Sequence, residues 1–128
     1  MTAETPLRIL NKVEVDPLTE DRETVTQDPI VLSLKTRLQD RLGENLKELW
    51  LFGSRARGDA DEDSDYDVLV VAVDPEKTNE ETVLREGYGI MMSNFALVGS
   101  ICYSPEAWVR SKRTPLGMNI LKEGIRLL

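Results

Sequence analysis

The sequence of 128 residues predicts a single α/β domain of the α+β type, in which helices pack on a small mixed β-sheet. Three observations predict this fold class. Short apolar runs at residues 46–54, 66–74 and 95–104 have the length of buried strands. Segments with apolar residues at helical spacing lie before and between these runs. Proline directly follows Asp, Ser or Thr where such segments begin, which is typical of the first turn of a helix.

The first predicted helix covers residues 28–43. Asp28 is the predicted N-cap, and Pro29 takes the first helical position. Apolar residues then recur at helical spacing, and Gly43 is the expected stop. The folded domain is therefore predicted to span residues 29–128.

The segment before this helix has a different composition. Residues 1–28 mix prolines, charged residues and turn formers with few large apolar residues. This composition predicts an irregular arm that is mobile or draped on the surface. The sequence leaves open whether residues 8–15 form a short strand.

The second half of the chain combines helix and strand signals. Residues 75–94 begin like a helix, although Gly87 and Gly89 are expected to weaken its later turns. Residues 125–128 are expected to form a short strand or an extended tail. Two short helices are expected between them, starting at Ser104 with Pro105 and at Thr114 with Pro115, the second ending at Gly124.

Composition excludes several classes of site. The net charge of −7 gives no global attraction to nucleic acid, although local basic groups occur at residues 55–57 and 110–113. The chain has no histidine and one cysteine, Cys102, which excludes His ligands, a disulfide framework and a thiolate zinc site. The apolar runs are too short to cross a bilayer and no signal segment opens the chain, so a cytoplasmic protein without membrane attachment is expected.

The stretch GSRARG follows the first predicted strand. Gly53 and Ser54 predict a sharp turn in which a phosphate group can approach the backbone closely. Arg55 and Arg57 supply positive charge that could neutralise a phosphate. Taken alone, a Gly-Ser pair before arginine is more often an ordinary turn.

Six carboxylates follow between residues 59 and 67, just before the second predicted strand. Asp65 and Asp67 are two residues apart, so both side chains should project from one face of that strand while Tyr66 points into the packing. Two like charges on one face repel unless a hard cation such as Mg²⁺ lies between them. Ser64 is expected to cap the turn, and the four earlier acids are expected to form a solvated loop.

The Gly-Ser turn and the Asp-x-Asp pair occur together, which places a phosphate site beside a metal site. The stretch GSRARGDADEDSDYDVLVV resembles the signature of the DNA polymerase beta-like nucleotidyltransferase superfamily. Within it, the chain is similar to the minimal nucleotidyltransferase (MNT) group of single-domain proteins. The resemblance implies a polymerase beta-like palm.

The resemblance also implies a reaction and a set of site residues. The superfamily transfers NMP from an NTP to an acceptor hydroxyl and releases pyrophosphate. Its roles fall on Gly53 and Ser54 as triphosphate binders, and on Asp65 and Asp67 as catalytic Mg²⁺ (or Mn²⁺) ligands. Arg57 matches the motif's arginine, as a phosphate contact or as a brace of the loop. ATP is the implied substrate, and HEPN-type toxins are the implied protein partners, since MNT proteins are often their antitoxins.

One feature departs from the resemblance. Active members usually carry a third carboxylate on a neighbouring strand, and the segment FALVGSICYS contains none. Glu106, Glu86 and Glu123 are remote candidates without a spacing argument. The absence leaves an alternative open: a weak or inactive nucleotide-binding module that neutralises a partner by binding it. A small-molecule acceptor is less favoured, although a homo-oligomer could build a pocket for one.

Overall fold

The computed structural model describes residues 24–73 and 77–128, apart from the side chains of residues 77–79. The first part holds α2 (Pro29–Leu42), a 3-10 turn (Gly43–Asn45), β1 (Leu46–Phe52), α3 (Ser54–Arg57) and β2 (Tyr66–Ala72). The second part holds α4 (Lys77–Asn94), β3 (Val98–Tyr103), α5 (Pro105–Ser111), α6 (Pro115–Glu123) and β4 (Ile125–Arg126).

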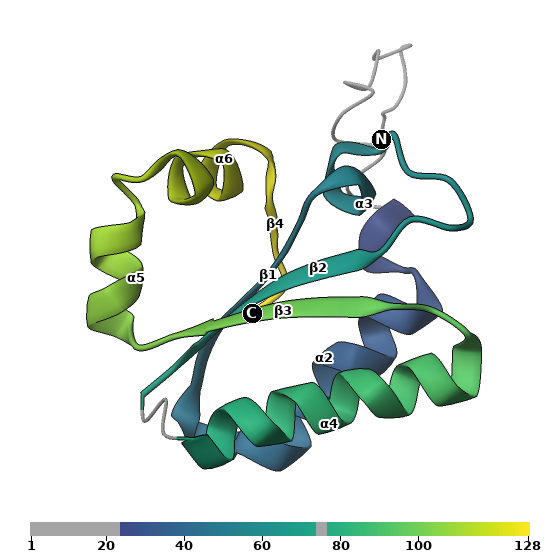
Figure 1. The fold of residues 1–128 in the computed structure, drawn as a ribbon, viewed down its shortest axis with the longest axis horizontal. Helices are drawn as coiled ribbons and strands as arrows, with labels where there is room; N and C mark the ends of the chain where they lie inside the picture. Colours follow the sequence, from purple (N-terminus) through teal and green to yellow (C-terminus); the bar gives the residue numbers. More distant parts are fainter. Residues whose placement is uncertain (1–23, 74–76) are drawn as a thin grey trace, which may run out of the picture.

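The strands form one mixed sheet in the order β3-β2-β1-β4. β1 is antiparallel to both β2 and β4, whereas β2 and β3 are parallel and connected through α4. A parallel pair needs a crossover of this kind, because its second strand must start from the same end as the first. Figure 1 shows α2 and α4 together on one side of the sheet, with α5 and α6 away from them.

Each face of the sheet has its own apolar cluster. Along β2, Val68 and Val70 pack with residues of α2 and α4, whereas Leu69 and Val71 pack with Trp108 and Ile120 of α5 and α6. This alternation follows from the two-residue period of a strand. It also assigns the neighbouring residues: even-numbered positions of β2 face α2 and α4, and odd-numbered positions face α5 and α6.

The predicted helix starts are confirmed. The Asp28 side chain accepts a hydrogen bond from the Ile30 N–H (2.8 Å) at the start of α2. Ser104 and Thr114 accept equivalent bonds from Ala107 (3.0 Å) and Gly117 (3.1 Å), which start α5 and α6. Each cap satisfies a backbone donor that has no partner within its helix.

The predicted fold class is confirmed, and one local prediction needs correction. α4 continues through Gly87 and Gly89 without a break, and both glycines lie where neighbouring elements approach closely. A Cβ at Gly87 would meet Val98 at 3.4 Å, and one at Gly89 would meet the Arg37 guanidinium at 3.1 Å. Residues 24–26, expected to be irregular, form a helical turn, and the remaining arm at 1–23 lies outside the described residues.

The end of the chain, for which a strand or a tail was expected, forms the short strand β4. Ile125 pairs with Leu51 and Arg126 pairs with Trp50. None of the helices in the described ranges is long and apolar enough to cross a bilayer.

Glu86 joins α4 to α2 and is the only buried charged residue among the residues that the structure describes. It is 6% exposed, and its carboxylate contacts Arg37 (3.2 Å) and Arg41 (3.1 Å). The predicted remote role of Glu86 as a third metal ligand is therefore not supported by its position, since it faces the two arginines of α2.

Glu86→Gln should lower the free energy of unfolding by about 1–2 kcal/mol, because two arginines lose their acidic partner while both stay partly hydrated. Denaturant unfolding measures the loss. Glu81→Gln, an exposed change on the same helix, is the control and should stay within about 0.5 kcal/mol of wild type. Equal stability of the two variants would contradict a structural role for the Glu86 ion pairs.

Candidate active site

The predicted site residues meet at one edge of the sheet, where β1 ends and β2 and β3 begin. The register pairs Phe52 with Asp67, and Asp67 with Gly99. The Gly53–Ser54 turn comes directly after Phe52, so the antiparallel pairing carries it to the Asp67 carboxylate. The two motifs seen in the sequence are therefore adjacent in space.

Position 53 favours glycine because of its backbone conformation and its close approach to Asp67. A Cβ on Gly53 would collide with Oδ2 of Asp67. Gly53 also has φ +76°, a conformation that residues with a side chain rarely adopt. The predicted sharp turn after β1 is thus confirmed, and it delivers Ser54 into the four-residue helix α3.

The two aspartates lie close together but in different environments. Asp65 precedes β2 and is exposed, whereas Asp67 lies within the strand and is half-buried. Burial raises the pKa of Asp67, the charge of Asp65 raises it further, and Arg57 opposes both. The pair therefore holds more negative charge than its protein surroundings neutralise, which favours a bound cation.

The chemistry of these donors fits a hard divalent ion. Carboxylate oxygens suit Mg²⁺, which commonly uses one or two protein carboxylates and takes its other ligands from water and substrate phosphates. Within the described ranges, no group of three or more His, Cys, Asp or Glu side chains is placed to hold a metal ion. Asp65 and Asp67 would therefore need ligands from a nucleotide to complete a coordination shell.

Arg57 lies on the accessible side of this edge. Its guanidinium forms ion pairs with Asp59 (3.2 Å) and with Glu123 at the end of α6 (3.6 Å). The hydrogen bond and the charge of Asp59, with a smaller contribution from Glu123, raise the pKa of Arg57. Glu123, a remote candidate for a third metal ligand, is thus an ion-pair partner of the motif's arginine.

The position where a third carboxylate would face Asp67 is Gly99. Both residues lie at odd-numbered positions of paired parallel strands, on the face shared with α5 and α6. An ideal Cβ on Gly99 would lie 3.2 Å from Oδ1 of Asp67. The remaining candidate, Glu106, is exposed in the first turn of α5. β3 therefore has no side chain at the position that faces Asp67, where an acidic residue was expected.

The four earlier acids lie exposed in a loop, as expected, and local hydrogen bonds shape this loop. Asp61 accepts hydrogen bonds from the Asp63 N–H (2.9 Å) and the Ser64 hydroxyl (3.2 Å). The Ser64 hydroxyl in turn accepts a bond from the Asp61 N–H (3.0 Å), which confirms the predicted capping of the turn. The sequence signal was present, since Asp and Ser favour such local turns.

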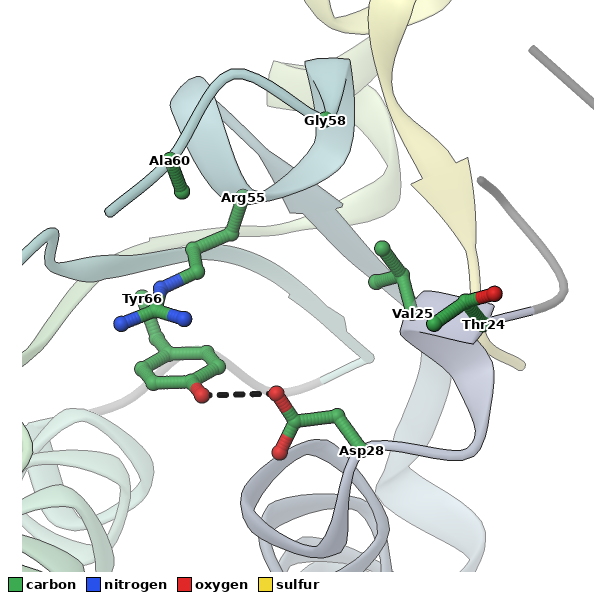
Figure 2. Close-up of a pocket in the computed structure, with 7 residues that line it drawn as sticks. All are labelled: Thr24, Val25, Asp28, Arg55, Gly58, Ala60 and Tyr66. Atoms are coloured by element: carbon green, nitrogen blue, oxygen red, sulfur yellow. Dashed lines mark hydrogen bonds between the residues drawn. The ribbon is translucent and has the colours of Figure 1, made fainter. Parts of the chain in front are cut away.

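A pocket of about 250 Å³ lies behind the site, where Tyr66 faces α2 (Figure 2). Tyr66 is 3% exposed, and its hydroxyl donates a hydrogen bond to Oδ2 of Asp28 (2.7 Å). The guanidinium of Arg55 lies 4.3 Å from the centre of the Tyr66 ring. Because Tyr66 and Asp67 point to opposite faces of β2, this pocket is separate from the aspartate pair. No pattern in the sequence indicates the link between Tyr66 and Asp28.

The comparison with known families agrees with this geometry. Residues 31–91 match the family model for the nucleotidyltransferase domain. The match begins in α2, includes both motifs and ends in α4, and it confirms the resemblance inferred from the sequence. No curated protein matches the chain in a sequence search.

Solved structures share the fold at low sequence identity. A toxin–antitoxin complex with AMP-PNP is 21% identical with a TM-score of 0.55, and the match covers 74% of this chain and 70% of the other. A mutant of the toxin–antitoxin MntA-HpeT is 19% identical with a TM-score of 0.54, covering 73% and 69%. A putative nucleotidyltransferase from Sulfolobus solfataricus is 20% identical with a TM-score of 0.51, covering 90% and 89%. These likenesses establish the nucleotidyltransferase fold.

Tyr66→Phe should remove a late tyrosine ionisation. Burial, followed by the hydrogen bond and charge of Asp28, raises the pKa of Tyr66 from 10.0 to about 12, while Arg55 lowers it slightly. The neutral phenol therefore stabilises the fold fully below pH 10, and this contribution is lost as the pH rises towards 12.

Tyrosinate absorbance during an alkaline titration measures the effect. The wild-type chain should show one ionisation near pH 12 that Tyr66→Phe lacks. Tyr88→Phe, which removes an exposed hydroxyl, should keep it. A wild-type titration that is complete near pH 10 would contradict the buried link to Asp28.

Proposed function

We propose that this chain is a divalent-metal-dependent nucleotidyltransferase that transfers NMP, with ATP as the favoured donor, to an acceptor hydroxyl. The observation that carries the proposal is the close approach of Gly53 to Asp67, which supports a phosphate-binding turn beside a metal-binding aspartate pair. The family match over residues 31–91 supports the same reaction class.

In this proposal each site residue has one task. Asp65 and Asp67 hold Mg²⁺ or Mn²⁺, and the turn at Gly53 and Ser54 binds the triphosphate. Arg57, which already lies near Asp67, adds positive charge next to the phosphates. A bound divalent ion supplies charge neutralisation at the phosphate oxygens.

The proposed transfer proceeds by in-line displacement. The acceptor oxygen forms a bond to the α-phosphorus, the bond from that phosphorus to the bridging oxygen breaks, and pyrophosphate leaves with its electron pair. The acceptor proton passes to solvent water as the new ester forms. The protein contributes positioning and electrostatics, because the phosphoryl chemistry needs no covalent bond to the chain.

The proposed acceptor is a protein partner, a HEPN-type toxin for which this chain would be the antitoxin. Two of the structural neighbours are described as toxin–antitoxin complexes, one of them with AMP-PNP. A hydroxyl side chain of the partner, such as a tyrosine, would receive the AMP group.

Asp65→Asn should weaken binding of a non-hydrolysable ATP analogue in the presence of Mg²⁺ by at least about tenfold, because a charged ligand is lost. Calorimetric titration with and without Mg²⁺ measures this change, and AMP transfer to the partner should fall with it. Asp63→Asn is the matched control, since it removes the same charge from an exposed position in the same loop. Undiminished binding or transfer in Asp65→Asn would overturn the assignment.

A second candidate function is a nucleotide-binding antitoxin that neutralises its partner without modifying it. Gly99 favours this candidate, because β3 offers no carboxylate opposite Asp67. Transfer by two metal ions needs ligands on the acceptor side as well as on the leaving-group side. With two aspartates, the chain would hold one metal ion together with the nucleotide phosphates.

Gly99→Asp should then raise the number of Mn²⁺ ions bound per chain from about one to about two in the presence of the ATP analogue. The Oδ1 atom of Asp67 is the end of a side chain and can shift by the few tenths of an ångström that a new Cβ requires. Mn²⁺ titration followed by electron paramagnetic resonance counts the ions. Ser100→Asp, one residue along β3 and on its opposite face, is the control and should leave the count unchanged.

Transfer measurements separate the two candidates. A wild-type chain that modifies its partner and gains nothing from Gly99→Asp is a transferase that needs no acid on β3. A wild-type chain that binds the analogue, neutralises the partner and leaves it unmodified is the binding antitoxin.

A further inference from the structure

Arg55, in α3, has an unusual set of partners for an arginine beside an acidic loop. Its Nε–H and Nη2–H groups donate to the Ser64 carbonyl (3.2 and 3.0 Å), and Nη2–H also donates to the Glu62 carbonyl (3.2 Å). In the described part of the chain, no ion pair of Arg55 with a carboxylate is found. The guanidinium thus holds the backbone of the acidic loop instead of neutralising its side chains.

The other side of the guanidinium rests on a fixed surface. It lies over the Tyr66 ring, 4.3 Å from the ring centre, and Tyr66 is buried. The Tyr66 hydroxyl is bonded to Asp28, which also caps α2 through the Ile30 N–H. Figure 2 shows Arg55 over the ring and the bond to Asp28 beneath it. Arg55 is therefore anchored through Tyr66 to the start of α2.

Asp65 lies between the two points that Arg55 holds. Ser64, whose carbonyl accepts two bonds from Arg55, precedes it, and Tyr66, whose ring carries the guanidinium, follows it. β2 begins only at Tyr66, where the Tyr66 N–H bonds to the Leu97 carbonyl (2.8 Å). Asp67 is fixed by strand pairing on both sides, whereas Asp65 lies outside the ladder.

We propose that Arg55 is the positioning residue of Asp65, and that it fixes this metal-binding carboxylate from behind the strand without contacting metal or nucleotide. This inference rests on the proposed function. Arg55 is suited to the task because its planar fork bonds two carbonyls while its face stacks on an aromatic ring. A lysine at this position would keep the charge but lose the fork and the stacking.

Arg55→Lys should therefore weaken binding of Mn²⁺ with the ATP analogue by about tenfold, in the range typical of residues that orient metal ligands. Arg41→Lys is the matched control, because it makes the same exchange at an exposed arginine that pairs with Glu86 in the ion pairs between α2 and α4. Its affinity should equal that of wild type. Thermal unfolding of both variants checks that the folds remain comparable.

Combining Arg55→Lys with a substitution at Asp65 or at Asp67 tests whether Arg55 acts on Asp65 alone or loosens the whole site. If Arg55 acts through Asp65, adding Arg55→Lys to Asp65→Asn should change the remaining Mn²⁺ affinity less than twofold, while adding it to Asp67→Asn should still cost about tenfold. Equal losses in both backgrounds, or no loss in the wild-type background, would overturn the proposal.

A measurement without metal separates this inference from the proposed function. In Arg55→Lys, NMR amide relaxation should show increased motion at Asp65 and unchanged order at Asp67. Increased motion at both residues, or at neither, would refute positioning by Arg55. Absence of any Mn²⁺-dependent nucleotide binding in the wild-type chain would instead defeat the nucleotidyltransferase proposal, and with it the functional meaning of the Arg55 contacts.

Discussion

The pairing of β1 with β2 is the constraint on which the candidate site depends. It places Phe52 opposite Asp67, so the turn after β1 meets the start of β2. The turn brings Gly53 close to the Asp67 carboxylate, and burial raises the pKa of Asp67. Burial makes the charged form of a carboxylate less favourable. Natural proteins tolerate such unfavourable features mainly at functional sites. The position of the candidate site is thus set by the register of β1 against β2.

The two arginines of GSRARG have different tasks because α3 is helical. Residues two apart on a helix point in different directions. Arg55 turns towards Tyr66 and the loop backbone, whereas Arg57 turns towards Asp59 and Glu123. The sequence suggested phosphate contact for both, or loop bracing by Arg57. Arg55 bonds the backbone of the loop at Glu62 and Ser64, whereas Arg57 bonds the side chain of Asp59 at the start of the loop.

Two glycines flank the Asp67 carboxylate, and they have opposite meanings for function. Gly53 lets the turn approach Asp67, an arrangement that the proposed nucleotide and metal site requires. Gly99 leaves the neighbouring strand without an acid, which limits the ligands for a second metal ion. The fold shared with toxin–antitoxin structures is compatible with a transferase and with a binding antitoxin. The two functions differ in whether enough metal ligands surround the Asp67 carboxylate.

Local sequence patterns determined most of the elements of this protein. Asp28, Ser104 and Thr114 start helices through short-range hydrogen bonds, and the apolar run that follows Tyr66 forms a strand buried on both faces. The motif from Gly53 to Asp67 likewise predicted that the turn and the aspartates lie together, because their spacing along the chain is short.

Contacts between distant segments were decided only by the tertiary structure. Asp28 meets Tyr66 across 38 positions, and Glu86 meets Arg37 across 49. Strand register set Gly99 against Asp67, and helix packing let α4 continue through Gly87 and Gly89. These outcomes depend on which surfaces pack together, and no local propensity carries that information.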